Sequence, residues 1–254
     1  MPLNSLALLA LLCASAAGAK GVDAFPRADE LFAHPRAAPK QFQPGVSGYE
    51  LNGRARSDLS IGHSQGLVRG RAGDQLWLWQ ADARALWLSR WSRRDIDAAD
   101  FVVELPVSVR RGDISFLAAP FHETSRRGGS EPRATATGLR TLGAVEPWPW
   151  LRAYGGASFL IDTAPSPKRW GLQGGVELMS GDLGLAKGTP IRVYAAEDVQ
   201  MPERAGFNPS ARLAVGVKIK ALRVQAGYYS GHSYFGRFQA DREHFADLSV
   251  MLEL

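Results

Sequence analysis

The sequence is nearly free of cysteine. The one cysteine, Cys13, falls in an apolar stretch near the N-terminus that we expect to be removed, so the mature chain would contain none. Disulfide cross-links, thiolate metal sites and cysteine nucleophiles are therefore excluded from the mature chain. Lipoprotein processing at Cys13 is not expected either, because Leu12 stands where a small residue is required.

Long apolar runs are also missing. After Ala19, no stretch approaches the length of about 20 residues that a transmembrane helix requires. The run from Leu6 to Ala17 is too short to span a bilayer and ends in small residues, which predicts a signal peptide over residues 1–19. The formal net charge of +5 weakly indicates contact with phosphate-bearing lipid, and a solvated surface explains it better.

The rest of the chain divides into two regions that differ in residue pattern. Residues 20–45 hold four prolines and little alternation, which predicts an irregular periplasmic arm. From 46 to 254, segments of about ten residues alternate apolar and polar, as is typical of transmembrane β-barrels. We predict an all-β fold, a single antiparallel up-and-down transmembrane β-barrel of about twelve strands. The expected strands lie near 47–54, 58–69, 76–91, 101–110, 114–122, 134–145, 151–161, 170–178, 189–197, 212–219, 222–229 and 248–254.

The expected connections alternate in length. Those near 70–73, 110–113, 146–149 and 220–221 are short, and those near 91–97, 123–133, 198–210 and 230–242 are longer. Such alternation predicts short periplasmic turns and longer outer loops. The segment 180–188 departs from the rule, because it is long on the side of the short turns.

The segment 76–91 carries the clearest membrane signal. Trp77, Trp79 and Trp87 share one face with alanines between them, whereas Gln80, Asp82 and Arg84 share the other face. The first face predicts a lipid-facing band with aromatic girdles, and the second predicts a polar lumen. The same alternation directs four more charged residues to the lumen: Glu104, Arg110, Arg152 and Glu177. A soluble periplasmic β-sandwich binding protein, which would bury the tryptophans, is an alternative.

The stretch from Tyr228 to Phe238, followed by Asp241-Arg242, resembles a known family. It is similar to the uncharacterised Gram-negative envelope proteins catalogued as domain of unknown function 1207, which carry Tyr-Tyr-x-Gly-His-Ser-x-x-Gly-x-Phe before their last strand. The matching loop residues are Gly231, His232, Ser233, Gly236, Phe238, Asp241 and Arg242. Shorter matches are His34-Pro35-Arg36, Trp79-Gln80, Leu105-Pro106 to Arg111-Gly112, and Tyr154-Gly155-Gly156.

The resemblance implies outer-membrane barrel topology and brings no established activity. In that family the equivalent of His122 continues into Ser-Ser-His-x-Gly-Asp-Glu. Here His122 is followed by Glu123-Thr124-Ser125-Arg126, so the second histidine and both acids are gone. If that motif is a site in relatives, the site is altered or absent in this chain.

Four residues are candidates for catalysis. His232 and Ser233 fall in the last outer loop with Asp241, and His122 falls at the start of another outer loop. A histidine that takes the proton of a hydroxyl, oriented by an acid, would suit an outer-leaflet lipid hydrolase of lipid A deacylase or phospholipase type. His232 and Ser233 are adjacent, so His232 could activate Ser233 only if the loop bends. A loop that simply caps the lumen is the competing interpretation.

Arginines gather in the expected outer loops: Arg90, Arg93, Arg94, Arg126, Arg127 and Arg133. Arginine pairs well with phosphate, so they indicate either lipopolysaccharide contact or ordinary solvation. No nucleotide motif or zinc spacing is present, so we expect no cofactor, metal or nucleic-acid partner. The leading interpretation is a non-enzymatic integral barrel of the bacterial outer membrane, structural or a restricted pore, with the lipid hydrolase as the rival. Its expected partners are outer-membrane lipid and, during biogenesis, the barrel-assembly machinery.

Overall fold

The computed structural model describes residues 22–26, 30–72, 77–127, 133–164, 168–185 and 188–253. The predicted signal peptide, residues 1–19, lies outside the described residues. Within the described ranges, no helix is long and apolar enough to cross a membrane.

Nearly all regular structure in the described residues is β-strand. The strands are β1 (Val22–Ala24), β2 (Gly45–Leu51), β3 (Arg54–Ala72), β4 (Trp77–Ser92), β5 (Asp95–Glu104), β6 (Val107–Arg111), β7 (Ile114–Arg127), β8 (Ala134–Trp148), β9 (Leu151–Ala164), β10 (Trp170–Met179), β11 (Ile191–Pro202), β12 (Ser210–Ile219), β13 (Leu222–His232) and β14 (Arg242–Leu252). Two short 3-10 turns, η1 (Glu203–Ala205) and η2 (Gly236–Phe238), complete the described elements.

The sheet closes on itself because β2 pairs with β14 on one side and with β3 on the other. β5 and β6 both lie between β4 and β7, so together they fill one position in the wall. The break between them falls at Leu105-Pro106, since proline has no N–H to give to a sheet. The result is a closed antiparallel barrel of twelve strand positions, which confirms the predicted fold class. The β-sandwich alternative is wrong, because the two edges of the sheet are joined.

Alternation along the strands separates an apolar outer face from a polar inner face. On β14, Leu248 and Val250 are exposed on the outside, whereas Asp247 and Ser249 are buried in the lumen. β4 follows the same pattern. Trp77, Trp79 and Trp87 are half-buried on its outer face, while Gln80, Asp82 and Arg84 are buried inside.

The two ends of the barrel differ. The turn end holds the start of β2, the end of β14 and, of the described connecting residues, 112–113, 149–150, 180–185, 188–190 and 220–221. The loop end holds, of the described connecting residues, 52–53, 93–94, 133, 168–169, 203–209 and 233–241. The prediction of a long loop at 91–97 is wrong: β4 and β5 run on to Ser92 and Asp95, leaving a two-residue turn in which Arg93 has a φ of 56°.

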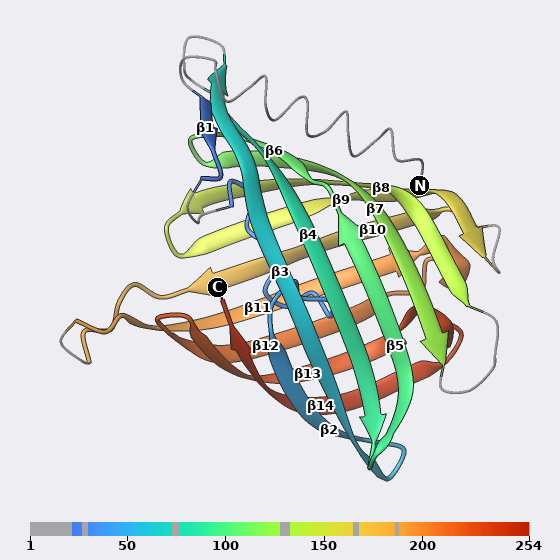
Figure 1. The fold of residues 1–254 in the computed structure, drawn as a ribbon. Helices are drawn as coiled ribbons and strands as arrows, with labels where there is room; N and C mark the ends of the chain where they lie inside the picture. The colour runs from blue at the N-terminus through green and yellow to red at the C-terminus, as the bar shows by residue number, and fades with distance from the viewer. Residues whose placement is uncertain are drawn as a thin grey trace.

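The arm before β2 runs through the interior of the barrel (Figure 1). Its Phe32 packs against Leu117 and Leu142, and its Phe42 packs against Leu86 and Leu88. The chain passes so close to β3 that a Cβ on Gly62 would lie 2.6 Å from the backbone nitrogen of Gln43. The protein's own N-terminal segment therefore occupies part of the lumen.

Candidate functional site

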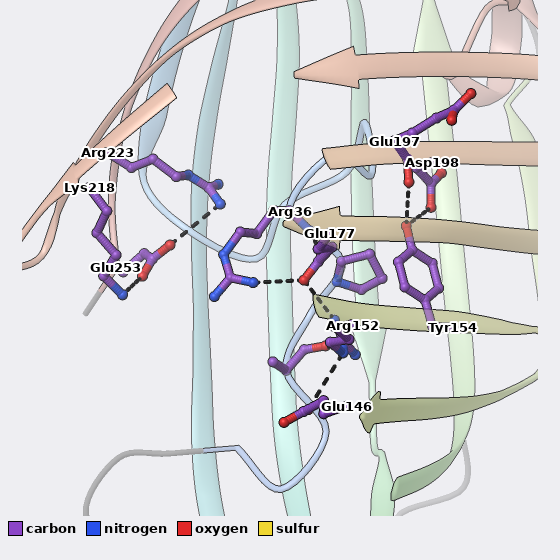
Figure 2. Close-up of polar contacts among 12 residues, drawn as sticks. Arg36, Glu146, Arg152, Tyr154, Glu177, Glu197, Asp198, Lys218, Arg223 and Glu253 are labelled. Atoms are coloured by element: carbon purple, nitrogen blue, oxygen red, sulfur yellow. Dashed lines mark hydrogen bonds and ion pairs between the residues drawn. The ribbon is translucent and has the colours of Figure 1, made fainter. Parts of the chain in front are cut away.

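The lumenal charges are bound to one another and to the arm. Arg36 of the arm donates from its guanidinium to Glu177 at 2.7 Å, and its backbone N–H donates to the same carboxylate at 2.6 Å. Arg152 also contacts Glu177, at 3.2 Å, and donates to the carbonyl of Ala33 at 2.7 Å. Figure 2 shows Glu177 between the two arginines. These contacts hold the arm against β9 and β10.

One further contact holds the arm, and another joins two strands of the wall. The Glu30 carboxylate lies 3.1 Å from Arg84, and Arg140 donates to Glu104 at 2.8 Å. Of the predicted lumenal residues, Gln80, Asp82, Arg84, Glu104, Arg152 and Glu177 are all buried inside the wall. Arg110 is paired with Glu146 at 2.7 Å and is only half-buried.

Lys40 links the arm to the loop end. Its ammonium donates to Asp100 on β5 at 2.7 Å and to Glu123 on β7 at 2.6 Å. The backbone N–H of Gly236, in the β13–β14 connection, donates to the same Asp100 at 3.0 Å. The arm and the last loop therefore share one buried carboxylate.

Arg90 fixes the β13–β14 connection inside the barrel. The sequence places Arg90 in an outer loop, and this is wrong, because it lies on β4 with its side chain buried. It forms two bonds to Glu243, at 2.5 and 3.0 Å, and its guanidinium carbon lies 4.5 Å from the centre of the Phe235 ring. Tyr234 of the same connection donates to Asp58.

This folding of the connection separates the predicted catalytic pair. Ser233 is buried, its backbone N–H donates to the carbonyl of Asp241 at 2.9 Å, and its hydroxyl has no described hydrogen-bond partner. The ring of His232 lies 3.0 Å from the carbonyl of Gln239 instead. The structure thus gives His232 no bond to Ser233 or to the Asp241 carboxylate, and the loop-cap interpretation fits this segment better.

His122 lies elsewhere than the sequence predicts. β7 continues to Arg127, so His122 sits within a strand rather than at the start of a loop. Inward-facing Phe121 and Ser125 are buried, whereas the alternate positions 122, 124 and 126 face outward. His122 therefore points to the membrane side of the wall, far from His232: β7 and β13 are six of the twelve wall positions apart.

Each ring nitrogen of His122 lies within hydrogen-bond distance of a different hydroxyl. Nδ1 lies 2.8 Å from Oγ1 of Thr137 on β8, and Nε2 lies 3.2 Å from Oγ1 of Thr124, two residues along β7. The pairing of β7 with β8 sets His122 directly opposite Thr137. Asp162 of β9 is the next residue in the same row and is exposed. A nucleophile, a base and an orienting group within hydrogen-bond reach are the elements of covalent acyl transfer.

These residues lie where the outer face changes in character. From the middle of β7 and β8 toward the loop end, the outward pairs are Phe116 with Gly143, Ala118 with Thr141, Pro120 with Leu139, His122 with Thr137, and Thr124 with Thr135. Below the row of His122 the only hydroxyl among these pairs is on Thr141, whereas the rows of His122 and Thr124 carry hydroxyls on Thr137, Thr124 and Thr135. That boundary is the place where lipid tails meet lipid headgroups on a barrel surface.

A second pair of the same kind occurs on the opposite side of the wall. Oγ of Ser230 lies 2.9 Å from Nδ1 of His244 on neighbouring outward positions of β13 and β14. Among the described residues, nothing hydrogen-bonds the other ring nitrogen of His244. No group of three or more histidines or acids in the described part of the chain could hold a metal.

The fold is that of outer-membrane barrels. The chain is similar to outer membrane phospholipase A from Escherichia coli, with a TM-score of 0.57 and 13% identity over 87% of this chain and 95% of that chain. The corresponding phospholipase of Salmonella typhi, a dimer with bound calcium, gives a TM-score of 0.62, 13% identity and coverages of 87% and 94%. The KdgM porin gives 0.51 and 7% identity over 84% and 99%. At such identities the likeness shows the fold alone.

No known family and no curated protein matches the sequence, so the resemblance to domain of unknown function 1207 stays a prediction. Sequence reasoning singled out His122 but missed Thr124, Thr137, Ser230 and His244. Thr124 could have been found, because strand alternation puts residues two apart on one face. Thr137 could not, since it needs the register between β7 and β8.

Proposed function

We propose that this barrel is an outer-membrane hydrolase that cleaves an acyl ester of outer-leaflet lipid at the outward site formed by His122, Thr124 and Thr137. The observation that carries the proposal is the pair of hydroxyls on the two nitrogens of the His122 ring, 2.8 and 3.2 Å away. The loop end faces outward in this proposal, in keeping with the position of β1 and the end of β14 at the turn end.

The chemistry follows from the two contacts. If Nδ1–H donates to Thr137, then Nε2 is free to accept the Thr124 proton as that hydroxyl attacks the ester carbonyl carbon. The C–O bond to the alcohol then breaks, and the alcohol leaves with the proton from His122. Water, deprotonated by His122, hydrolyses the acyl-threonine and restores the hydroxyl. Thr137 orients the ring throughout.

The position of the site supports a lipid substrate. It lies on the outer face of the wall, where a soluble substrate would compete with surrounding lipid. The apolar pair Pro120 and Leu139 lies one row below, and Thr124 and Thr135 lie one row above. An acyl ester occupies the same level in a bilayer, between the hydrocarbon and the headgroup.

The position of the arm inside the lumen favours a hydrolase over an open pore. The arm crosses the interior and is held by buried charges at Glu177 and Asp100. A closed barrel with a purely structural role would have the same interior. It would give no function to the contacts of His122 with the hydroxyls of Thr124 and Thr137.

The test is hydrolysis of lipid by the purified protein in mixed micelles, followed by mass spectrometry of released fatty acid. His122→Ala should lower the rate at least about 100-fold, the contribution of a general base. His63→Ala, at another exposed outward position, is the matched control and should keep full activity. If His244→Ala removes activity and His122→Ala does not, the Ser230 pair carries the reaction and the proposal is wrong. Absence of hydrolysis in the unaltered protein also overturns it.

A further inference from the structure

We infer that Arg126 and Arg133 form a binding site for the phosphate group of the lipid whose ester lies at His122, so that the substrate is a phosphorylated acyl lipid. This inference rests on the proposed function for the link between binding and cleavage. The binding itself stands on the arginines alone and can be measured separately.

The register brings the two arginines together. β7 and β8 pair from Ile114 opposite Val145 as far as Ser125 opposite Ala134. Continued by one residue, this register would set Arg126 of β7 opposite Arg133, which directly precedes β8, and both residues are exposed. In an antiparallel pair, directly opposed residues have Cβ atoms about 5 Å apart. Two positive charges therefore meet on the outward face of the wall.

Like charges on directly opposed residues destabilise a sheet unless a group of opposite charge lies between them. No described residue forms an ion pair with Arg126 or Arg133. The outward carboxylate near Arg126 on β5 is Asp97, and it is already bound to Arg56 at 2.7 Å. An anion from outside the chain would relieve the repulsion, and guanidinium groups bind phosphate oxygens in paired hydrogen bonds.

The position along the strand fits a lipid. Arg126 lies two residues beyond Thr124 on the same face, about 7 Å toward the loop end at ~3.3 Å per residue. The order along the wall is therefore apolar residues, then the ester site, then the two arginines. A phosphorylated lipid presents tails, ester and phosphate in that same order.

Two lipid sources carry this chemistry, an acylated phosphosugar such as lipid A and a glycerophospholipid. Native mass spectrometry of the detergent-solubilised protein can compare lipid A, dephosphorylated lipid A, phosphatidylglycerol and inorganic phosphate. We expect phosphorylated lipid to be retained about tenfold or more over its dephosphorylated form. Preference for lipid A or for phosphatidylglycerol identifies the source. Binding of inorganic phosphate alone would overturn the lipid assignment.

The variant Arg126→Gln/Arg133→Gln should lose the preference for phosphorylated lipid. The control Arg54→Gln/Arg242→Gln removes the same charge from two exposed residues on β3 and β14, which lie three and five wall positions from β7, and it should keep the preference. Equal losses in both variants would mean a general charge effect and would overturn the inference. Thr124→Val should bind normally without cleaving. Phosphate-dependent binding without cleavage of any ester would refute the hydrolase while sustaining the lipid site.

Discussion

Nε2 of His122 lies 3.2 Å from Oγ1 of Thr124 on the outer face of β7. This contact is the reason that the hydroxyl of Thr124 is the proposed nucleophile. Thr124→Val removes the hydroxyl at nearly constant shape and should lower kcat at least about 100-fold. Thr124→Ser keeps a hydroxyl and removes a methyl group beside it, so it should retain or raise the rate. Thr141→Val, on the same outer face of β8, is the control. Full activity in Thr124→Val would contradict the assignment.

Thr137 is expected to act as a positioning residue. Its hydroxyl lies 2.8 Å from Nδ1 of His122, and its loss leaves the ring free to turn. Thr137→Val should lower kcat about fivefold with little change in KM, since a neutral hydrogen bond contributes about 1 kcal/mol. Thr137→Asn restores an acceptor and should recover most of the rate. If valine and asparagine have the same effect, the hydroxyl does not orient the ring.

The arm should be the element that closes the lumen. At Gly62 an added Cβ would lie 2.6 Å from the backbone nitrogen of Gln43 and 2.7 Å from the carbonyl carbon of Phe42. Gly62→Val should therefore displace the arm and raise single-channel conductance in planar bilayers. Gly48→Val is the matched control, because nothing lies within 4 Å of a Cβ there. Unchanged conductance in Gly62→Val, with the fold retained, would mean that the arm does not close the path.

One contact at the loop end should depend on pH. The Glu203 carboxylate accepts hydrogen bonds from the backbone N–H groups of Arg169 and Trp170, both at 3.0 Å, and these bonds hold its pKa below the usual range. The contact is thus fully present above the ordinary glutamate pKa of about 4.3 and is lost as pH falls through the lowered value. Hydrogen exchange at the Trp170 amide should show protection at pH 6 that disappears in strong acid. Glu203→Gln should make the protection independent of pH.

The fold could be predicted because the alternation of apolar and polar residues can be recognised within each strand by itself. Alternation on β4 separates Trp79 from Gln80 without any knowledge of neighbouring strands, and the same rule holds around the wall. The break of one strand position into β5 and β6 follows from Pro106 only once the pairing is known. The two-residue turn at 93–94 was missed because Asp95 and Asp97 look like loop residues, although both lie in β5 near the barrel rim.

The candidate site depends on pairing between strands. Thr137 is 15 residues from His122, and only the β7–β8 register sets them opposite each other. The position of the arm is equally non-local, since Arg36 and Glu177 are 141 residues apart. His232 and Ser233 were attractive because they are adjacent in a family-like motif. The buried packing of Phe235 and Tyr234 draws that segment into the lumen instead.

Covalent labelling of the nucleophile tests the central claim most directly. A p-nitrophenyl phosphonate analogue of an acyl lipid forms an oxygen–phosphorus bond with an activated hydroxyl and releases p-nitrophenolate. Peptide mass spectrometry should find the phosphonyl group on Thr124, and His122→Ala should abolish the adduct. A phosphonyl group on Ser230 in place of Thr124, or no adduct on any residue, would contradict the assignment of Thr124 as the nucleophile.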